Sequence, residues 1–478
     1  LSDHDSHLYI RDDSGGLLIG CFEPLGKSID PKLLGEDFSF QLLPEDWDHF
    51  EPMMRNALHR LPLLENAPIK MLLNGPESFT PDGNFLLGEI SNKKGLFINA
   101  GLNSIGIASA GGAGMALSKL IIEGSTPFDL HELDPKRFDP VFCDINVLSK
   151  RVPEVLGKHY EISYPGRQWN TSRNLKQMPL HYKWEKMGAF FGQVNAIERP
   201  LFFNSKRDPE LTFKQPDWYN NVKEEVYHVQ NSAGIIDQSS FGKIEIKGQD
   251  AIMFLKSICT ANFDKQDFSI IYGLILNEKG GIECDLTCVR TKVNEYYITT
   301  GTGYATHDFD WISRNIPSDL NAQLIDVTSS NAVLSLFGPK ARDILQMVTL
   351  NDVSDNGHPF GSARQISIAG CPVLALRITY VGELGWELHL PVEYAQTIYN
   401  TLIEAGSPLG LRNAGYRAIE TLRLEKGYRA WSSDIGPDHT PDEAGLGWAI
   451  KMKSNISFKG REAIAKQRAE GIKKIMAT

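Results

Sequence analysis

Residues 96–118, LFINAGLNSIGIASAGGAGMALS, carry no charge, and this stretch places the strongest limit on the fold. A helix that spans a membrane needs about 20 strongly apolar residues. This stretch instead contains Asn99, Asn103, several serines and five glycines. It predicts a strand, a tight turn and a helix that begins near residues 111–114, and it gives no reason to expect a membrane partner.

The glycines of this stretch favour either of two uses. Glycine lets a backbone approach a ligand closely, and a helix N-terminus offers free N–H groups and a partial positive charge to an anion. Glycine also permits tight packing of a helix on a sheet. The pattern is not the GxGxxG dinucleotide fingerprint, which needs its own βαβ unit and a downstream acid, so both uses stay open.

The pattern of residues changes twice along the sequence, which predicts a multidomain α+β protein with regions 1–127, 128–188 and 189–478. The middle region interleaves aromatic and basic residues, a pattern that can bind single-stranded nucleic acid. The net charge of −10 argues against a nucleic-acid partner, because phosphate binding needs a concentrated basic face. We therefore interpret residues 128–188 as a connecting domain. Six scattered cysteines indicate no disulfide framework and favour a reducing compartment.

The segment NEKGGIECDLTCVR, residues 277–290, predicts a glycine turn followed by a strand. Because side chains alternate along a strand, Ile282, Cys284, Leu286 and Cys288 should share an apolar face. The cysteines lack the partners of a metal or nucleophile site, so no metal site is expected. Asp285 lies on the opposite face, either as a ligand-facing acid or as a solvated carboxylate near a turn.

The segment RITYVGELGWELHLP, residues 377–391, is a strand interrupted by Gly382 and Gly385. Tyr380 and Glu387 flank the interruption, and His389 shares a face with Glu387. An aromatic ring and an acid together can hold a flat heterocycle with an aminopyrimidine edge. A hairpin with an exposed acid is the alternative.

Two helices are predicted near the C-terminal end. Ala418, Ile419 and Leu422 lie on one face of an amphipathic helix. Thr440 and Glu443 have the spacing of a capping box, so a helix should begin there.

Six motifs occur in a fixed order: LNGPESFTPDGNFLLGE, AGLNSIGIASAGGAG, HELDPKRF, ILNEKGGIECDLT, RITYVGELGWELHLP and RLEKGYRAW. This ordered set resembles the flavin-dependent dimethylglycine and sarcosine dehydrogenases. Those enzymes join an FAD-dependent amine-oxidase domain to a domain like the aminomethyltransferase of the glycine cleavage system. The resemblance implies the C-terminal part of the oxidase domain in 1–127, a small connecting domain in 128–188, and a folate-binding domain in 189–478.

The resemblance also implies a two-site enzyme with FAD and tetrahydrofolate as cofactors. FAD would take a hydride from the N-methyl group of dimethylglycine or sarcosine, and tetrahydrofolate would capture the one-carbon unit. Asp285 matches the folate-site aspartate, expected to be ionised at neutral pH with an ordinary pKa, and Tyr9 matches an active-site tyrosine beside the flavin. The other matched positions are Gly101, Leu102, Asn103, Ser104, Ile105, Gly106 and Ile107 for FAD, and Tyr380, Glu387, Leu388, His389 and Trp448 for folate.

The chain departs from the family pattern at both ends. The N-terminal GxGxxG unit, the flavin-linking histidine and the small C-terminal barrel are missing, so we expect a piece of a longer protein. The resemblance leaves open the methylated amine, the electron acceptor and the flavin linkage, and implies the mitochondrial matrix in a eukaryote or the cytoplasm in a bacterium.

A non-catalytic regulatory subunit like that of pyruvate dehydrogenase phosphatase is the alternative function. Glu387 and Tyr380, retained beside Asp285, favour the enzyme, because a regulator has no need of a pterin site. Residues 1–127 disfavour a bare one-carbon transferase, since that family lacks them.

Overall fold

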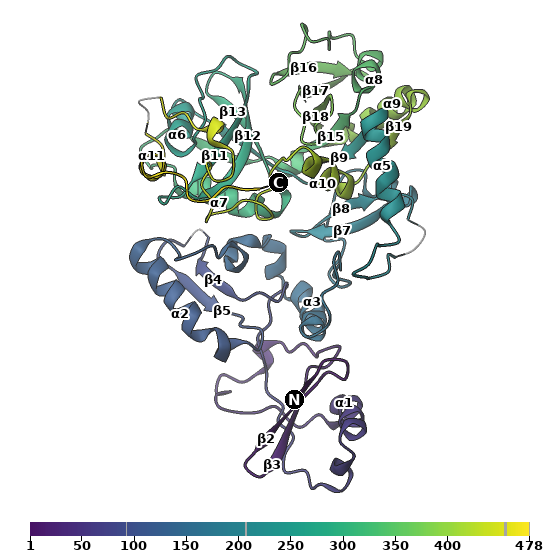
Figure 1. The fold of residues 1–478 in the computed structure, drawn as a ribbon, viewed down its shortest axis with the longest axis vertical. Coiled ribbons are helices and arrows are strands. Elements are labelled where there is room, and N and C mark those ends of the chain that lie inside the picture. Colours follow the sequence, from purple (N-terminus) through teal and green to yellow (C-terminus); the bar gives the residue numbers. More distant parts are fainter. Residues whose placement is uncertain (92, 206–207, 454–456, 478) are drawn as a thin grey trace. The chain divides into compact units, whose positions relative to one another are not determined.

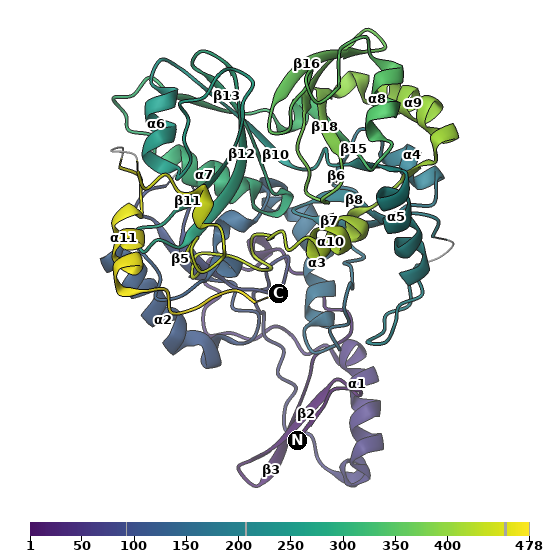
Figure 2. The same ribbon diagram turned by 45° about the horizontal axis from the view of Figure 1, so that its top comes forward.

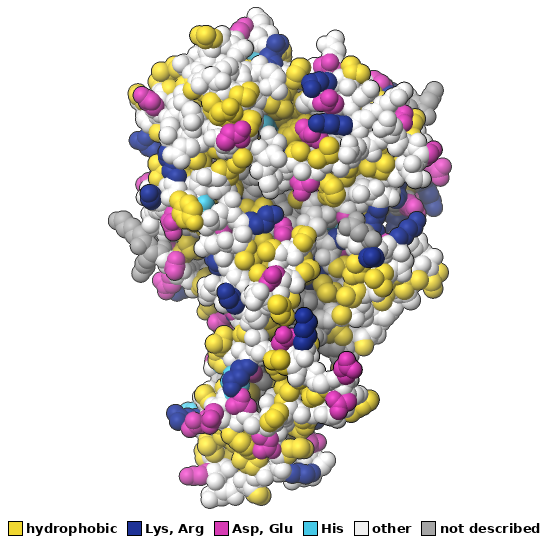
Figure 3. Space-filling view, turned by 180° about the vertical axis from the view of Figure 1, so that it is seen from behind, with side chains coloured by type: hydrophobic (Ala, Val, Ile, Leu, Met, Phe, Trp, Pro, Cys, Tyr) yellow, Lys and Arg dark blue, Asp and Glu magenta, His cyan; other side chains and the backbone are white. Residues whose placement is uncertain are grey.

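The computed structural model describes residues 1–91, 93–205, 208–453 and 457–477. The chain divides into two compact units, Leu1–Arg173 and Asn174–Thr478. Each unit mixes helices and strands, so the predicted α+β character is confirmed (Figure 1). The face shown in Figure 3 intersperses Lys and Arg with Asp and Glu, and the described residues gather no purely basic area on it.

The first unit begins with a three-stranded antiparallel sheet, β1 (Ser2–Asp3), β2 (Leu8–Asp13) and β3 (Gly16–Cys21). Asp13 pairs with Gly16 across a two-residue turn, in which Ser14 and Gly15 have φ of 53° and 80°. A two-residue turn with positive φ at both positions matches the twist of a hairpin. Helix α1 (Trp47–Arg60) packs Met53 and Ala57 against Leu8 of β2.

The uncharged stretch forms a strand, a turn and a helix, as predicted. Strand β5 (Phe97–Ala100) pairs with β4 (Leu86–Glu89), and helix α2 (Gly106–Glu123) packs Ala113 and Ala116 against Leu87. The predicted start of the helix near residues 111–114 is wrong, because the left-handed turn lies earlier. No helix in the described ranges has the length and hydropathy that a membrane crossing requires.

The turn before α2 explains where the helix starts. Gly101, Asn103 and Ser104 have φ of 65°, 47° and 64°, so the chain reverses there and is free to enter the helix at Gly106. A Cβ atom added at residues 111, 112 or 114 would meet nothing within 4 Å. Among the described residues, these three glycines are therefore not in tight packing contact with a sheet. Helix α3 (Ile145–Lys158) follows later in this unit, capped by the Asp144 carboxylate.

The second unit contains two large sheets (Figure 2). A five-stranded sheet has the order β11-β12-β13-β10-β14, and a six-stranded sheet has the order β16-β17-β18-β15-β9-β19. The first consists of β10 (Gly242–Lys247), β11 (Ile270–Leu276), β12 (Ile282–Lys292), β13 (Glu295–Thr300) and β14 (Gln323–Asp326). The second consists of β9 (Ala233–Asp237), β15 (Asn331–Phe337), β16 (Ala363–Ile368), β17 (Cys371–Leu376), β18 (Gly385–Pro391) and β19 (Leu411–Asn413).

Helices cover one face of each large sheet. Helices α6 (Ala251–Ile258) and α7 (Ala305–Arg314) share a core with the five-stranded sheet, and α8 (Ala341–Val348) and α9 (Ala395–Gly406) share one with the six-stranded sheet. The opposite faces meet only in part, where Val289 of β12 packs with Ala363 of β16 and Leu376 of β17, while α10 (Tyr416–Glu425) packs on Ile236 and Phe337 of the six-stranded sheet. A small sheet of β6 (Lys176–Gln177), β7 (Phe190–Val194) and β8 (Ile197–Phe202) precedes them, with α4 (His181–Lys186), α5 (Tyr219–Asn231) and α11 (Arg461–Glu470) elsewhere in the unit.

Strand β12 confirms most of the predicted alternation. Cys284, Leu286 and Cys288 are buried in the core formed with α6 and α7. Ile282 was predicted on the same face, and this is wrong: it packs in a different core with Leu276. The cause is a bulge at Glu283, since Cys284 pairs with Ile275 and Ile282 pairs with Leu276. One extra residue moves a side chain to the other face of the sheet.

The two predicted C-terminal helices have different outcomes. Helix α10 (Tyr416–Glu425) forms and buries Ala418, Ile419 and Leu422, as predicted. The capping-box hydrogen bonds also form, from the Thr440 N–H to Glu443 Oε2 at 3.0 Å and from the Glu443 N–H to Thr440 Oγ1 at 3.3 Å. They close a series of turns instead of a helix, so that prediction is wrong.

Candidate functional site

Asp285 projects from the face of β12 that is turned away from the cysteines. Tyr272, on the neighbouring strand β11, donates its hydroxyl to Asp285 Oδ2 at 3.2 Å. Burial and, to a smaller extent, the charge of Asp308 raise the pKa of the Asp285 carboxyl from 3.8 to about 6, although the Tyr272 hydrogen bond opposes the change. The expected ordinary pKa is therefore wrong, and Asp285 titrates just below neutral pH.

An aromatic wall adjoins Asp285. The ring of Trp448 stacks on Tyr272 with 5.5 Å between centroids and 27° between planes, and Trp448 is 71% exposed. A large aromatic ring that is left in solvent but held parallel to another provides a platform for a flat ligand. Tyr272 was not predicted, because only the register between β11 and β12 places it beside Asp285.

Tyr380 lies near the same acid. Its hydroxyl donates to the carbonyl oxygen of Arg429 at 2.8 Å, and its ring stacks on Tyr428 with 6.1 Å between centroids. Burial raises the pKa of the Tyr380 hydroxyl, and the charge of Asp285 adds to the increase. Tyr380 is therefore neutral at physiological pH and is held by both its ring and its hydroxyl.

Glu387 and His389 lie together on β18, as their spacing predicts. Both side chains are buried, and His389 Nε2 lies 3.5 Å from Glu387 Oε2. Tyr297 of the opposite sheet contacts His389 Nδ1 at 3.0 Å, which shows that this face of β18 points between the two sheets. Burial lowers the pKa of His389 and keeps the ring neutral. The side chain of Leu388 points the other way, into the core with α8 and α9.

Polar atoms beside Glu387 are incompletely paired. Within the described residues, Gln238 Nε2 is buried without a hydrogen bond, and His389 Nε2 has its contact with Glu387 Oε2 at 3.5 Å. Ser335, which pairs with Glu387 across the ladder, donates its hydroxyl to Gln238 Oε1. Buried polar groups are seldom left unpaired. These atoms suit the polar edge of a flat heterocycle such as the pterin of folate.

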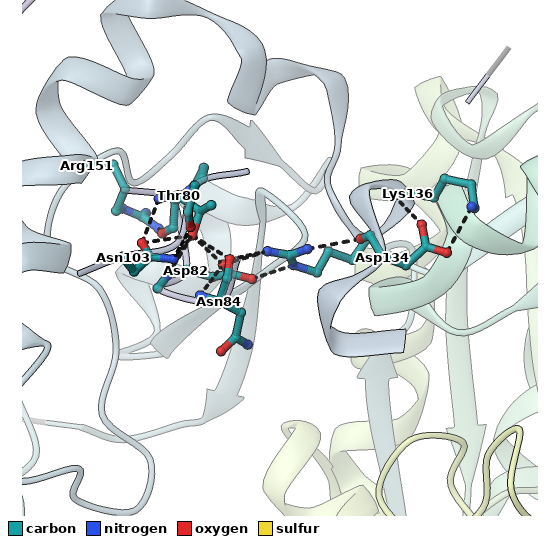
Figure 4. Close-up of polar contacts among 11 residues, drawn as sticks. Thr80, Asp82, Asn84, Asn103, Asp134, Lys136 and Arg151 are labelled. Atoms are coloured by element: carbon teal, nitrogen blue, oxygen red, sulfur yellow. Dashed lines mark hydrogen bonds and ion pairs between the residues drawn. The ribbon is translucent and has the colours of Figure 1, made fainter. Parts of the chain in front are cut away.

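The loop before α2 is held by a network of hydrogen bonds. Asn103 is fully buried, accepts the Thr80 N–H at 2.9 Å and donates to the Gly101 carbonyl oxygen at 2.6 Å (Figure 4). Thr80 is linked through Asp82 to Arg137, whose Nε lies 2.8 Å from the carboxylate.

This network fixes the turn, and α2 then begins at Gly106 with no side-chain cap and no acid in its first turn. Ile107 is fully exposed. Uncapped N–H groups at the start of an 18-residue helix fit the negative charge of a reduced flavin ring or a phosphate.

Tyr9 lies on β2, in the same unit as this loop. A Cβ atom at Gly20 would come within 1.9 Å of the Tyr9 ring, so the ring lies directly across the backbone of Gly20. Tyr9 is 38% exposed, and its ring centroid lies 5.8 Å from that of Phe22. The position of Tyr9 therefore depends on a glycine at residue 20.

The described parts of the chain hold no group of three His, Cys, Asp or Glu side chains suited to a metal ion. Cys284 and Cys288 are buried, and burial raises the pKa of each thiol well above its ordinary value. Both thiols are therefore protonated at neutral pH.

Family models define the class of protein. Residues 180–454 match the GCVT N-terminal domain, residues 123–177 match the FAD dependent oxidoreductase central domain, and residues 1–120 match the FAD dependent oxidoreductase. The chain therefore belongs to the family of proteins with a GCVT N-terminal domain, here joined to regions of the FAD dependent oxidoreductase type. The resemblance and the multidomain fold class expected from the sequence are confirmed, whereas the boundaries at residues 127 and 188 stay predictions.

Individual relatives narrow the comparison. The chain is 35% identical to a 4-methylaminobutanoate oxidase (formaldehyde-forming) of Paenarthrobacter nicotinovorans, over 97% of this chain and 56% of the relative. It is 33% identical to mouse mitochondrial sarcosine dehydrogenase, over 99% and 56%. It is 34% identical to the mouse mitochondrial pyruvate dehydrogenase phosphatase regulatory subunit, over 99% and 55%. The chain thus spans little more than half the length of these relatives.

One solved structure supports the fold. The glycine cleavage system aminomethyltransferase T from Bartonella henselae is 26% identical, with a TM-score of 0.53, and the match covers 62% of this chain and 76% of that one.

Proposed function

We propose that this chain serves the FAD-dependent oxidative N-demethylation of a methylated glycine, dimethylglycine or sarcosine, with transfer of the one-carbon unit to tetrahydrofolate. The observation that carries the proposal is the construction around Asp285: a carboxyl with a pKa near 6, a hydroxyl donor and an exposed stacked tryptophan on one face. FAD, when bound, supplies the hydride acceptor. The chain's own residues bind, orient and move protons.

The proposed reaction uses two sites, one for the amine and the flavin and one for the pterin. Tyr9 and the Gly101–Ile107 loop lie in the first unit and would contact the amine and the flavin. Asp285, Glu387, Tyr380 and Trp448 lie in the second unit and would hold the pterin. Asp285, ionised above pH 6, would stabilise positive charge that develops on the folate nitrogens and accept a proton there. His389 would keep Glu387 in place as an acceptor for the amino groups of the pterin.

The test uses Asp285→Asn in the full gene product that contains this chain. Amine oxidation should continue almost unchanged, because it occurs at the other site. Methylenetetrahydrofolate formation should fall about 10²- to 10⁴-fold, the usual contribution of a proton-transfer group, and free formaldehyde should rise in its place. Both products are measured with and without tetrahydrofolate.

Asp319→Asn provides the matched control, because Asp319 is an exposed aspartate of the same unit. It should change neither product. Equal folate coupling in wild type and Asp285→Asn would contradict the proposed role of Asp285.

A regulatory function is the second candidate, and the similarity to the phosphatase regulatory subunit favours it. A purely regulatory chain would form neither formaldehyde nor methylenetetrahydrofolate from any methylated glycine. The same assay therefore separates the two functions. The compartment, mitochondrial matrix in a eukaryote or cytoplasm in a bacterium, belongs to the proposal as well.

A further inference from the structure

An aromatic cluster lies in the first unit at the end of the β2–β3 hairpin, and we define it as Tyr9, Phe22, His159 and Tyr160. The centroids of Phe22 and Tyr160 are 3.9 Å apart, and those of His159 and Tyr160 are 4.8 Å apart at an interplanar angle of 80°. Tyr9 joins through Phe22 at 5.8 Å. Residues far apart in the sequence are thus brought into one group of rings.

The cluster is not part of a hydrophobic core. All four rings stay partly exposed, and none belongs to the buried cores of the described residues. Aromatic rings that only stabilise a fold are normally buried in such a core. These rings instead remain partly exposed, and one of them is held across the backbone of Gly20, as described above.

A carboxylate lies beside the rings. Glu77 is exposed and accepts the Ser104 hydroxyl at 2.9 Å, which ties it to the loop before α2. Burial raises the pKa of the Tyr160 hydroxyl, and the charge of Glu77 raises it further. Burial lowers the pKa of His159, so this ring is neutral at physiological pH although Glu77 opposes the effect. The surroundings are therefore neutral rings with one negative charge.

Two other groups face the cluster. Arg11 acts electrostatically on Tyr9 in the direction opposite to Glu77. His4 is exposed and lies 5.9 Å from the Tyr160 ring, with its Nδ1 at 3.3 Å from the Tyr160 carbonyl oxygen. The His4 ring therefore borders the cluster at Tyr160, about as far from it as Tyr9 is from Phe22.

We propose that the aromatic cluster and Glu77 form the binding site for the methylated ammonium group of the substrate. A methylated ammonium has few or no N–H groups for hydrogen bonds, and it is held by ring faces within about 6 Å and by a nearby negative charge. The hydrogen bond from Ser104 to Glu77 places this site next to the loop expected to contact the flavin. The proposal rests on the proposed function for the substrate class, and it assigns the residues that recognise the amine.

The test measures binding by the 478-residue chain with no flavin and no turnover. The probe is glycine betaine. Its nitrogen is quaternary and not a free amine, so betaine cannot be oxidised by hydride loss and is not turned over during the measurement. Its isostere 3,3-dimethylbutanoate has the same shape and carboxylate but an uncharged carbon in place of the quaternary nitrogen. Ligand-observed NMR titration should show betaine bound at least about tenfold more tightly than the isostere. Equal affinity would overturn the proposal.

Variants locate the site. Tyr160→Leu should weaken betaine binding about five- to thirtyfold, the range expected for one cation–π contact, whereas Tyr160→Phe keeps the ring and should bind like wild type. Glu77→Gln should weaken betaine binding and should not weaken binding of the anionic isostere. Phe128→Leu changes an exposed aromatic ring of the same unit outside the cluster and should have no effect. Undiminished betaine binding in a folded Tyr160→Leu variant would overturn the proposal.

The binding test and the assay of the proposed function can fail separately. If betaine binds as described but the gene product demethylates no amine, the proposed function fails and the cation site stands. If the gene product demethylates dimethylglycine or sarcosine with an unchanged KM in Tyr160→Leu, the cation site fails and the function stands.

Discussion

Asp285→Asn should make the second unit more stable at neutral pH, although it should impair folate chemistry. Asp285 is ionised at neutral pH in a place that disfavours its charge, which is why its pKa is raised from 3.8 to about 6. An asparagine has nearly the same shape and can still accept the Tyr272 hydroxyl through Oδ1. The substitution therefore removes a buried charge and keeps the hydrogen bond.

The magnitude follows from the pKa. A shift of about two units costs the folded state roughly 3 kcal/mol once the group is ionised in both states, at about 1.4 kcal/mol per unit. Burying the amide of asparagine also has a cost, so we expect a net gain of about 1–2 kcal/mol.

The gain should depend on pH. Above about pH 6 the aspartate is charged in both the folded and the unfolded state, and the full difference is present. Below its ordinary value of 3.8 it is protonated in both states, so the charge penalty and with it the gain from the substitution should disappear. A group with a raised carboxyl pKa thus destabilises the fold at high pH and has no such effect in acid.

Hydrogen exchange of residues 282–292 in increasing urea reports the unfolding free energy of the unit that carries Asp285. Wild type, Asp285→Asn and the surface control Asp319→Asn are compared at pH 4 and at pH 7.5 without folate. The control should match wild type at both values. Equal or lower stability of Asp285→Asn at pH 7.5, or a gain of the same size at pH 4, would refute the reasoning.

Three further predictions concern other parts of the chain. A thiol reagent should label exposed Cys143 rapidly and buried Cys284 only on unfolding. Rapid labelling of Cys284 in the Cys143→Ser variant would contradict the assignment of Cys284 to the core. Trp448→Leu should weaken folate binding about tenfold through lost stacking and leave Tm unchanged, because the ring is 71% exposed; calorimetry and a thermal melt test both parts, and a large fall in Tm would count against the platform. Gly20→Ala should displace the Tyr9 ring and cost about 1–3 kcal/mol, since the added Cβ would lie 1.9 Å from that ring; unchanged hydrogen exchange in the β2–β3 hairpin would be inconsistent with this.

Local sequence patterns predicted the elements well where the neighbouring chain did not interfere. Helix α10 and the strand-turn-helix of residues 97–123 arise from turn residues and periodicity. Ile282 shows the limit. Its face was assigned by alternation alone, and one bulge residue at Glu283 reverses it. A bulge is a property of the pair of strands, so a single strand's sequence does not reveal it.

Helix ends were also difficult to predict. The glycines at residues 111–114 look like a helix start, yet the three left-handed residues that make the turn come earlier, at Gly101, Asn103 and Ser104. Asn103 accepts that conformation because its amide is fully engaged with Thr80 and Gly101. At Thr440 the capping-box hydrogen bonds form without a helix. A local signal specifies a local contact, and the tertiary structure decides whether a helix extends beyond it.

The chemistry of Asp285 is a tertiary property for the same reason. Its carboxyl would titrate near 3.8 on an isolated strand; burial between the sheets, the charge of Asp308 and the Tyr272 hydroxyl together set the value near 6. Trp448, which completes the platform on Tyr272, lies far along the chain; the family resemblance marks it as a folate position, but only the fold shows that it stacks on Tyr272. The motif ECDLTC therefore supplies the acid, but the residues that tune it come from other strands and helices. A transplanted motif would carry the carboxylate without its raised pKa.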